Sequence, residues 1–124
     1  MKPEKIRPAF QALGFEDVIE VAVGADLCTI EEAKDFMKEV PEELPFMATS
    51  CCPAWSMMAK KLFPEQAKCI SMALTPMVLT ARLIKQQNPD CKIVFVGPCA
   101  AKKLEASRKT IRSYVCLLYT SRCV

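Results

Sequence analysis

Prolines divide this chain into short segments that alternate between helical and extended patterns of apolar residues. Pro53 and Pro76 each stand at the start of an amphipathic stretch, and proline is favoured at the first position of a helix because its ring fixes φ at a helical value. These positions predict helices over 53–62 and 75–87. We therefore expect a core built from short elements packed in layers.

The other segments complete an alternation of helices and strands. A helix is expected over 3–13 and ends at Gly14. Two more helices are expected, one from Asp26 or Thr29 to about Val40 and one over 98–109. Strands are expected over 17–24, 46–50, 68–71 and 91–97. The apolar run of 91–97 suits a central strand of a parallel sheet. The alternation predicts an α/β fold in which a parallel sheet of about four strands is flanked by helices.

The chain contains eight cysteines and no histidine among its 124 residues. It has no apolar run long enough for a membrane span and no signal-peptide core, so we expect a cytoplasmic protein, where disulfides are rare. Cysteine enrichment then indicates metal or redox chemistry, and without histidine the ligation is all-thiolate, of an iron–sulfur cluster or of zinc. The net charge of +3 is spread along the chain, a pattern that does not indicate nucleic-acid binding.

Two cysteines stand where a strand is expected to turn into a helix. Cys52 precedes Pro53, and Cys99 follows Pro98 directly before the helix-forming sequence AAKKLEA. Unpaired N–H groups at a helix start favour the thiolate, which is the form that binds metal. The spacing leaves two interpretations open: both thiolates bind one iron–sulfur cluster, or both are buried structural thiols.

Two motifs carry a resemblance to a known family. TSCCPAW (49–55) and PCAAKKLEA (98–106) resemble, without gaps, the first two cluster-binding motifs of iron-only, or [FeFe], hydrogenase catalytic domains, TSCCPxW and PCxxKxxE. The stretch ALGFEDVIEVAVGADLCTIEEAKDF (12–36) resembles the segment before the first motif, and the resemblance covers residues 3–115. It implies the fold of one lobe of that domain and an oxidoreductase that catalyses reversible H2 oxidation and proton reduction.

The resemblance also implies a cofactor, the six-iron H-cluster, in which a [4Fe–4S] cluster is joined to a diiron unit carrying CO, cyanide and a dithiolate bridge. By resemblance, Cys52 and Cys99 are two of the four cysteine ligands of the [4Fe–4S] cluster, and Pro98 belongs to the cofactor-binding turn. Cys51 matches a free cysteine that passes protons to the bridging amine. Lys102 matches a lysine that donates to an iron-bound cyanide, with a solvated helix lysine as the alternative.

A proton path follows from the same resemblance. It continues from Cys51 to Glu32, Ser71 and Asp35, and the i, i+3 spacing of the two acids places them on one helix face. Asp35 is shorter than the acid usually found there, which lengthens a proton hop, and an ordinary strand serine is the alternative for Ser71. Glu105 is expected to pair with a surface arginine. Three cysteines match no ligand position and are expected to be buried structural thiols: Cys28, Cys69 and Cys91.

The expected partners are ferredoxin or accessory iron–sulfur domains as electron partners, maturation proteins for the diiron unit, and H2 and protons as substrates, in an anaerobic cytoplasm. The family's third motif, with two more cluster cysteines, does not occur in this sequence, so we expect an inactive N-terminal part of the domain. Gly97 replaces the methionine of most catalytic members, which is similar to divergent, sensory-type branches. The alternatives are a hydrogenase-like protein of iron–sulfur assembly or electron transfer without a diiron site, and a zinc-binding or structural module.

The last nine residues, CLLYTSRCV (116–124), need a separate interpretation. They can be encoded by a transposon-end sequencing adaptor followed by its reverse complement, and that reading frame then reaches a stop codon. We therefore expect residues 116–124 to be a non-native adaptor translation and residues 1–115 to be a partial hydrogenase domain that ends near Val115. The alternative is a short apolar strand.

Overall fold

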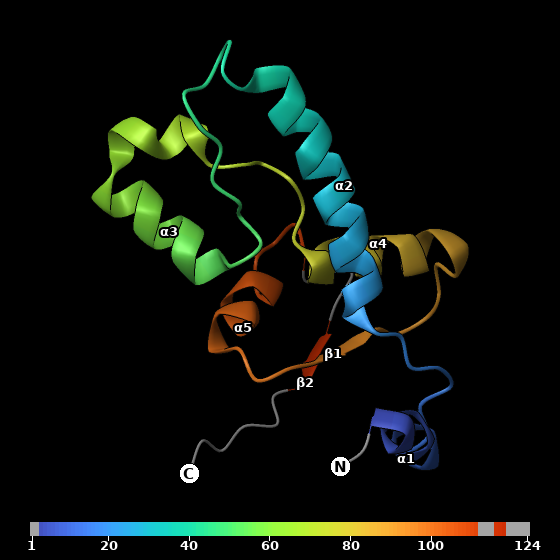
Figure 1. Cartoon of the computed structure of the whole chain (residues 1–124). Helices are drawn as coiled ribbons and strands as arrows, with labels where there is room; N and C mark the ends of the chain where they lie inside the picture. Colours follow the sequence, from blue (N-terminus) through green and yellow to red (C-terminus); the bar gives the residue numbers. More distant parts are fainter. Residues whose placement is uncertain (1–2, 112–115, 119–124) are drawn as a thin grey trace.

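A computed structural model of the chain describes residues 3–111 and 116–118, and these are mostly helical (Figure 1). In chain order the elements are η1 (Pro3–Lys5), α1 (Ile6–Ala12), α2 (Val21–Glu39), α3 (Pro53–Leu62), η2 (Pro64–Cys69), α4 (Pro76–Gln87), β1 (Val94–Val96), α5 (Ala100–Ala106) and β2 (Cys116–Leu118). The predicted native end near Val115 and residues 119–124 lie outside the described residues. Every helix in the described part is too short or too polar to cross a membrane.

The proline positions predicted two helices correctly. α3 and α4 begin at Pro53 and Pro76 and end close to the predicted residues. The N-terminal helix also stops where expected, because Gly14 follows it with a φ of +93°, a left-handed conformation that glycine adopts without strain. Proline and glycine therefore set these boundaries through local backbone sterics alone.

The strand predicted over 17–24 is wrong, because α2 already begins at Val21. The expected capping residues, Asp26 and Thr29, lie inside this helix, and Glu20 is its N-cap. Packing explains the difference: Gly24 faces α4 so closely that an added Cβ would lie 2.0 Å from Thr80 Oγ1. The close approach of α2 and α4 outweighs the weak strand preference of the β-branched residues here.

The described residues do not form the expected four-stranded sheet. β1 and β2 make a two-stranded parallel sheet with Val94 opposite Cys116. The predicted strands over 46–50 and 68–71 are reduced to one parallel bridge between Ala48 and Ile70, and η2 occupies most of the second one. The predicted strand over 91–97 is present as β1, but β2 comes from the segment interpreted as an adaptor translation. Residues 116–118 therefore form a short strand, which was the alternative interpretation of that segment.

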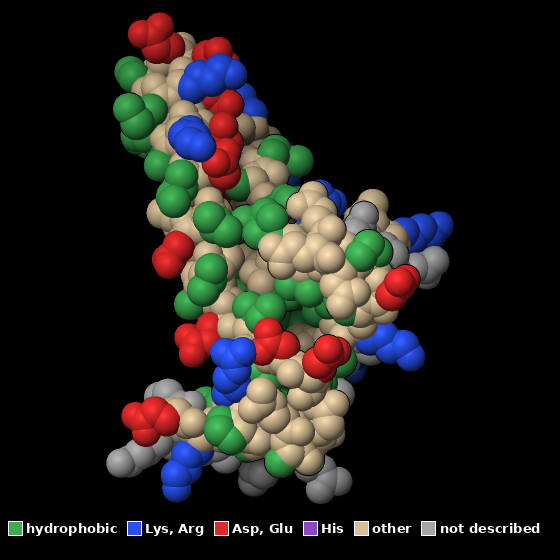
Figure 2. All heavy atoms as spheres, turned by 90° about the vertical axis from the view of Figure 1, so that its right-hand side faces the viewer, with side chains coloured by type: hydrophobic (Ala, Val, Ile, Leu, Met, Phe, Trp, Pro, Cys, Tyr) green, Lys and Arg blue, Asp and Glu red, His purple; other side chains and the backbone are tan. Residues whose placement is uncertain are grey.

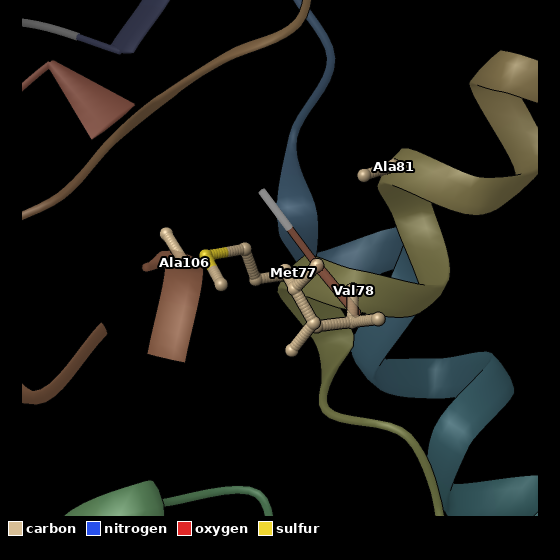
Figure 3. Packing of buried hydrophobic residues seen from close by; sticks show 5 residues of the cluster. Met77, Val78, Ala81 and Ala106 are labelled. Carbon is tan, nitrogen blue, oxygen red and sulfur yellow. The ribbon is translucent and has the colours of Figure 1, made fainter. Parts of the chain in front are cut away.

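The hydrophobic core lies where α4 meets α5. Met77, Val78 and Ala81 of α4 are buried with Ala106 and Ile111, and two partly buried residues of the β1 region, Ile93 and Phe95, pack against them. Figure 3 shows the Met77 side chain reaching toward Ala106. This core fixes α5, which carries the second cysteine motif, against α4.

The face of α2 that points away from α4 remains apolar and exposed. Val23, Leu27, Ile30 and Met37 follow helical spacing along it, and each is at least two-fifths exposed. Figure 2 shows hydrophobic side chains along the arm that α2 forms. Contiguous exposed apolar surface of this kind marks a face that other protein covers or that self-associates.

Candidate metal-cluster site

The two motif cysteines occupy equivalent positions at the starts of neighbouring helices. Cys52 is the N-cap of α3 and Cys99 the N-cap of α5, both with extended backbone angles, and both thiols are exposed. α3 and α5 are in contact, so the two helix starts belong to one region of the molecule (Figure 1). Two exposed thiols from separate segments of the chain therefore lie in one region of the structure.

Lys102 links these two segments. Its Nζ donates hydrogen bonds to Glu105 Oε2 at 2.7 Å, one turn further along α5, and to the backbone carbonyl of Cys51 at 3.0 Å. The ammonium has three N–H donors, and these contacts use two of them. Lys102 is thus not the solvated helix lysine of the alternative interpretation, because its side chain is only 14% exposed.

Glu105 is the anion of this link. Its side chain is 4% exposed and forms an ion pair with Lys102, where we expected a surface arginine as its partner. A buried carboxylate requires a cation or hydrogen-bond donors to offset its lost hydration. The second motif therefore contains its own charge pair, with its lysine and its glutamate at i and i+3 spacing on α5.

The segment that carries Cys51 is anchored to residues 69–73. Ala48 N–H donates to the Cys69 carbonyl and Ser71 N–H donates to the Ala48 carbonyl, both at 2.8 Å. Ser50 Oγ–H donates to the Ala73 carbonyl at 3.3 Å. On the other side, the Trp55 indole N–H donates to the Thr49 carbonyl at 3.0 Å. These bonds hold the segment that precedes Cys51, while the Cys51 thiol stays exposed.

Cys28 lies near this group, although the sequence suggested only a structural thiol. It is 6% exposed, and its Sγ–H donates to the Leu74 carbonyl at 3.0 Å. Burial raises its pKa above 9.0, the charges of Glu32 and Cys51 raise the pKa further, and the Lys102 ammonium opposes them. Cys28 therefore lies within electrostatic reach of three predicted site residues. The signal in the sequence was its i, i+4 spacing from Glu32 on α2.

Two residues of the predicted proton path share a cavity. Asp35 and Ser71 both line a partly open cavity of about 110 Å³ between α2 and residues 68–72. Ser71 is 7% exposed, and its Oγ accepts a hydrogen bond from Ala73 N–H at 3.1 Å. The structure thus brings together residues that are 36 positions apart in the sequence. Glu32 lies one turn before Asp35 on α2 and is half-buried.

Two of the predicted ligand thiols, Cys52 and Cys99, lie within the described residues. Among residues 3–111 and 116–118, no three His, Cys, Asp or Glu side chains are arranged to bind one metal ion. The donor set fits an iron–sulfur cluster to the extent of two thiols, Cys52 and Cys99, whereas such a cluster takes four cysteines. Pro98, predicted to belong to the same turn, is exposed and lines an apolar hollow with residues of β1. The ligand roles remain predictions.

Comparison with known proteins defines the class, which is that of iron-dependent hydrogenases and their relatives. A sequence model of the family described as "Iron only hydrogenase large subunit, C-terminal domain" matches residues 1–122, and the chain belongs to this family. The match runs into residues 116–122. The adaptor interpretation of that segment stays a prediction.

Three relatives illustrate the range of the family. Iron hydrogenase 1 of Clostridium pasteurianum is 36% identical over 84% of this chain and 20% of its own length. The periplasmic [Fe] hydrogenase large subunit of Nitratidesulfovibrio vulgaris is 30% identical, over 88% of this chain and 28% of its own. The cytosolic Fe-S cluster assembly factor NAR1 of Candida dubliniensis is 31% identical, over 80% and 18%. The chain thus spans between 18% and 28% of the length of these proteins.

Proposed function

We propose that the full-length protein carrying this chain is a hydrogenase that catalyses reversible H2 oxidation and proton reduction. One observation carries the proposal: Lys102 holds the Cys51 backbone beside the two N-cap cysteines, so that a free thiol, a cation and two ligand thiols belong to one region. The hydrogenase relatives support the same assignment. Gly97 in place of methionine supports a sensory-type branch, and a cytoplasmic location remains part of the proposal.

In this proposal Cys52 and Cys99 hold the [4Fe–4S] part of an H-cluster as thiolates. When bound, the complete group would supply the electrons and the iron at which H2 is formed or oxidised. Ligand cysteines beyond the described residues complete the site, and ferredoxin or accessory iron–sulfur domains exchange its electrons. Lys102 contributes a fixed positive charge, because Glu105 holds its ammonium at one end of α5 and a third N–H remains for an anionic ligand.

The chain's own residues would carry the protons. Cys51 holds a proton at its exposed thiol, and Glu32 takes it from the face of α2 that also carries Cys28. Ser71 Oγ can rotate its hydrogen toward the cavity because the oxygen already accepts from Ala73 N–H. Asp35 lines the same cavity and returns the proton toward solvent. The cavity that joins Ser71 to Asp35 supports this order.

A second candidate function is iron–sulfur assembly or electron transfer without a diiron site, which the similarity to NAR1 supports. Lys102 distinguishes the two poorly, because its bonds to Glu105 and to the Cys51 carbonyl give it a structural task in either case. Cys51 distinguishes them better: its thiol is exposed and the anchoring bond uses its carbonyl, so proton transfer is the task left for the side chain.

The test is to express the full-length protein with the maturation proteins of iron-only hydrogenases and to measure H2 evolution and infrared bands of iron-bound CO and cyanide. We expect both signals in the wild type, and loss of turnover with the bands retained in Cys51→Ser. Cys91→Ser is the matched control and should keep both signals, because Cys91 was predicted to be a structural thiol outside the site and is half-buried rather than buried. A cluster signal without these bands would establish the assembly function instead. The 124-residue chain alone, reconstituted with iron and sulfide, should evolve no H2.

A further inference from the structure

Two consecutive backbone carbonyls accept side-chain hydrogen bonds from two separate parts of the chain. The Leu74 carbonyl accepts from the Cys28 thiol of α2 at 3.0 Å, and the Ala73 carbonyl accepts from the Ser50 hydroxyl at 3.3 Å. Both carbonyls belong to the segment that leads from η2 into α4 (Figure 1). This segment therefore joins α2 to the loop that carries Cys51.

One face of α2 runs along this segment. Gly24, Cys28 and Glu32 are spaced by four residues and therefore lie on the same face of the helix. Gly24 lies against the first turn of α4, since an added Cβ would be 3.0 Å from the Pro76 carbonyl oxygen. One helical turn later, Cys28 is bonded to the residue that precedes α4 by two positions, Leu74.

The position of Glu32 follows from the order of these contacts. Beyond Cys28, the next contact along α2 is that of Asp35, which shares its cavity with Ser71. Glu32 lies between the two on α2 and is thus at the level of residues 72–73, where Ser50 is bonded. The pKa of Cys28 supports this placement, because the charges of both Glu32 and Cys51 raise it.

We propose that Cys28 and Ser50 are positioning residues that set the separation of Glu32 from Cys51. The proposal rests on the hydrogenase function proposed above and concerns the transfer nearest the metal centre. In the direction of H2 evolution, an O–H bond breaks at Glu32 while an S–H bond forms at Cys51, and no electron moves. Such a transfer needs the two groups within hydrogen-bond reach of each other or of one shared water.

The Cys28 thiol is suited to this task. It is 6% exposed, so water competes little for its bond to the Leu74 carbonyl. Burial is the largest cause of its raised pKa, which keeps the thiol protonated and therefore a donor at neutral pH. Cys28 neither gains nor loses a proton in the proposed role.

The first experiment measures H2 turnover of the full-length enzyme, normalised to the infrared bands of iron-bound CO and cyanide. Cys28→Ala removes the donor to the Leu74 carbonyl, so we expect kcat to fall by about 10-fold with KM unchanged, less than the ~10²-fold of a misplacement of about 1 Å. Cys28→Ser keeps a donor and should recover most of the rate. Thr29→Ala is the matched control and should keep the rate, because the Thr29 hydroxyl donates to the Ala25 carbonyl inside α2 itself.

The same assay tests the other side of the segment. Ser50→Ala should lower kcat by less than Cys28→Ala, because its bond is the longer of the two, and Ser50→Thr should recover the loss. The solvent deuterium isotope effect on kcat should rise in Cys28→Ala, since the longer proton transfer becomes rate-limiting; a smaller folded fraction would leave it unchanged. An unchanged kcat in Cys28→Ala, an equal loss in Cys28→Ser or Thr29→Ala, or an unchanged isotope effect would overturn the proposal.

The second experiment needs no assembled metal centre. Glu32→Cys is combined with Cys28→Ser or with Cys28→Ala in the full-length protein purified without its iron, and dibromobimane, which bridges neighbouring thiols, is added. Mass spectrometry quantifies the bridge between position 32 and Cys51. We expect the bridge with Cys28→Ser and several-fold less of it with Cys28→Ala. Glu31→Cys in place of Glu32→Cys is the control and should give none, because Glu31 is exposed on another face of α2.

The two experiments separate the geometry from the reaction. No bridge with Cys28→Ser, or equal amounts of it with Cys28→Ser and Cys28→Ala, would overturn the positioning role. The expected bridging in a protein whose matured wild type evolves no H2 would instead overturn the hydrogenase function, and with it the catalytic use of this geometry.

Discussion

The region around Lys102 and the N-terminal segment each contain an ion pair, but the two pairs are built differently. Lys102 and Glu105 are 14% and 4% exposed, and the lysine also holds the backbone of a distant loop. Arg7 and Asp17 are 60% and 54% exposed and link α1 to the turn that follows it. The residues of α1 are exposed or half-buried, with one edge-to-face contact between Phe10 and Phe15.

The two ion pairs are expected to contribute differently to stability. An exposed ion pair contributes at most about 1 kcal/mol because water and salt screen both charges. Removing one partner of a buried pair is far more costly, since the other charge remains without its counterion in a place that water does not reach. Of these two regions, the one with the cysteine motifs has the ion pair in a fixed, buried geometry.

Replacing Glu105 should give the largest effect in this comparison. Glu105→Gln leaves the Lys102 ammonium largely buried without an anion, so we expect a loss of about 3–5 kcal/mol in the free energy of unfolding. Chemical denaturation of the 124-residue chain measures it. Asp17→Asn, the matched change in the exposed pair, should cost no more than about 1 kcal/mol. The double variant Lys102→Met with Glu105→Leu should recover most of the loss, and equal costs for the two single variants would contradict the contrast between the regions.

Gly24 tests the close contact of α2 with α4. An added Cβ would lie 2.0 Å from Thr80 Oγ1 and 3.0 Å from the Pro76 carbonyl oxygen. Thr80 is β-branched and stiff, and the carbonyl is backbone, so Gly24→Ala should cost about 1–3 kcal/mol of unfolding free energy. Thermal and chemical unfolding check the value. Adding Thr80→Ala should recover part of the loss, and a stabilising effect of Gly24→Ala would show that the helices are further apart.

The pH dependence of stability should reveal Cys28. Because its pKa in the folded chain lies above the ordinary 9.0, the unfolded chain loses this proton first as pH rises. The stabilising contribution is complete below pH 9 and decreases above it, by up to about 1.4 kcal/mol per pH unit. Denaturation curves from neutral pH to about pH 10 measure the slope. Cys28→Ser keeps a donor for the Leu74 carbonyl without a thiol and should have a shallower slope; an equal slope would contradict the assignment.

The sequence predicted those elements whose limits are set by local sterics. α3 and α4 begin at prolines, and Gly14 ends the first helix, because these residues restrict their own backbone. The start of α2 was missed, since its β-branched residues favour a strand until α4 packs against Gly24. The sheet was overestimated for a related reason: a parallel strand needs a partner from elsewhere in the chain, and apolar content alone does not supply one.

The candidate site was predictable to the level of motifs but not of partners. The motifs indicated Cys51, Cys52, Cys99 and Lys102, yet the bond from Lys102 to the Cys51 carbonyl joins residues 51 positions apart and depends on the packing of α3 with α5. The cavity that Asp35 and Ser71 share was likewise not predictable, because it depends on how α2 packs against residues 68–72. Pairings between distant elements are decided by tertiary packing, which a single sequence does not encode in readable form.

Lys102 donates its hydrogen bond to the backbone carbonyl oxygen of residue 51, an atom that every amino acid provides. Anchoring and reactivity are therefore assigned to different parts of the same residue. Position 51 can exchange its thiol for selenium, a carboxylate or a hydroxyl and still be presented from the same spot. The proton affinity of the group at that spot becomes an adjustable property, open to evolution or to the chemist without redesign of the surrounding loop.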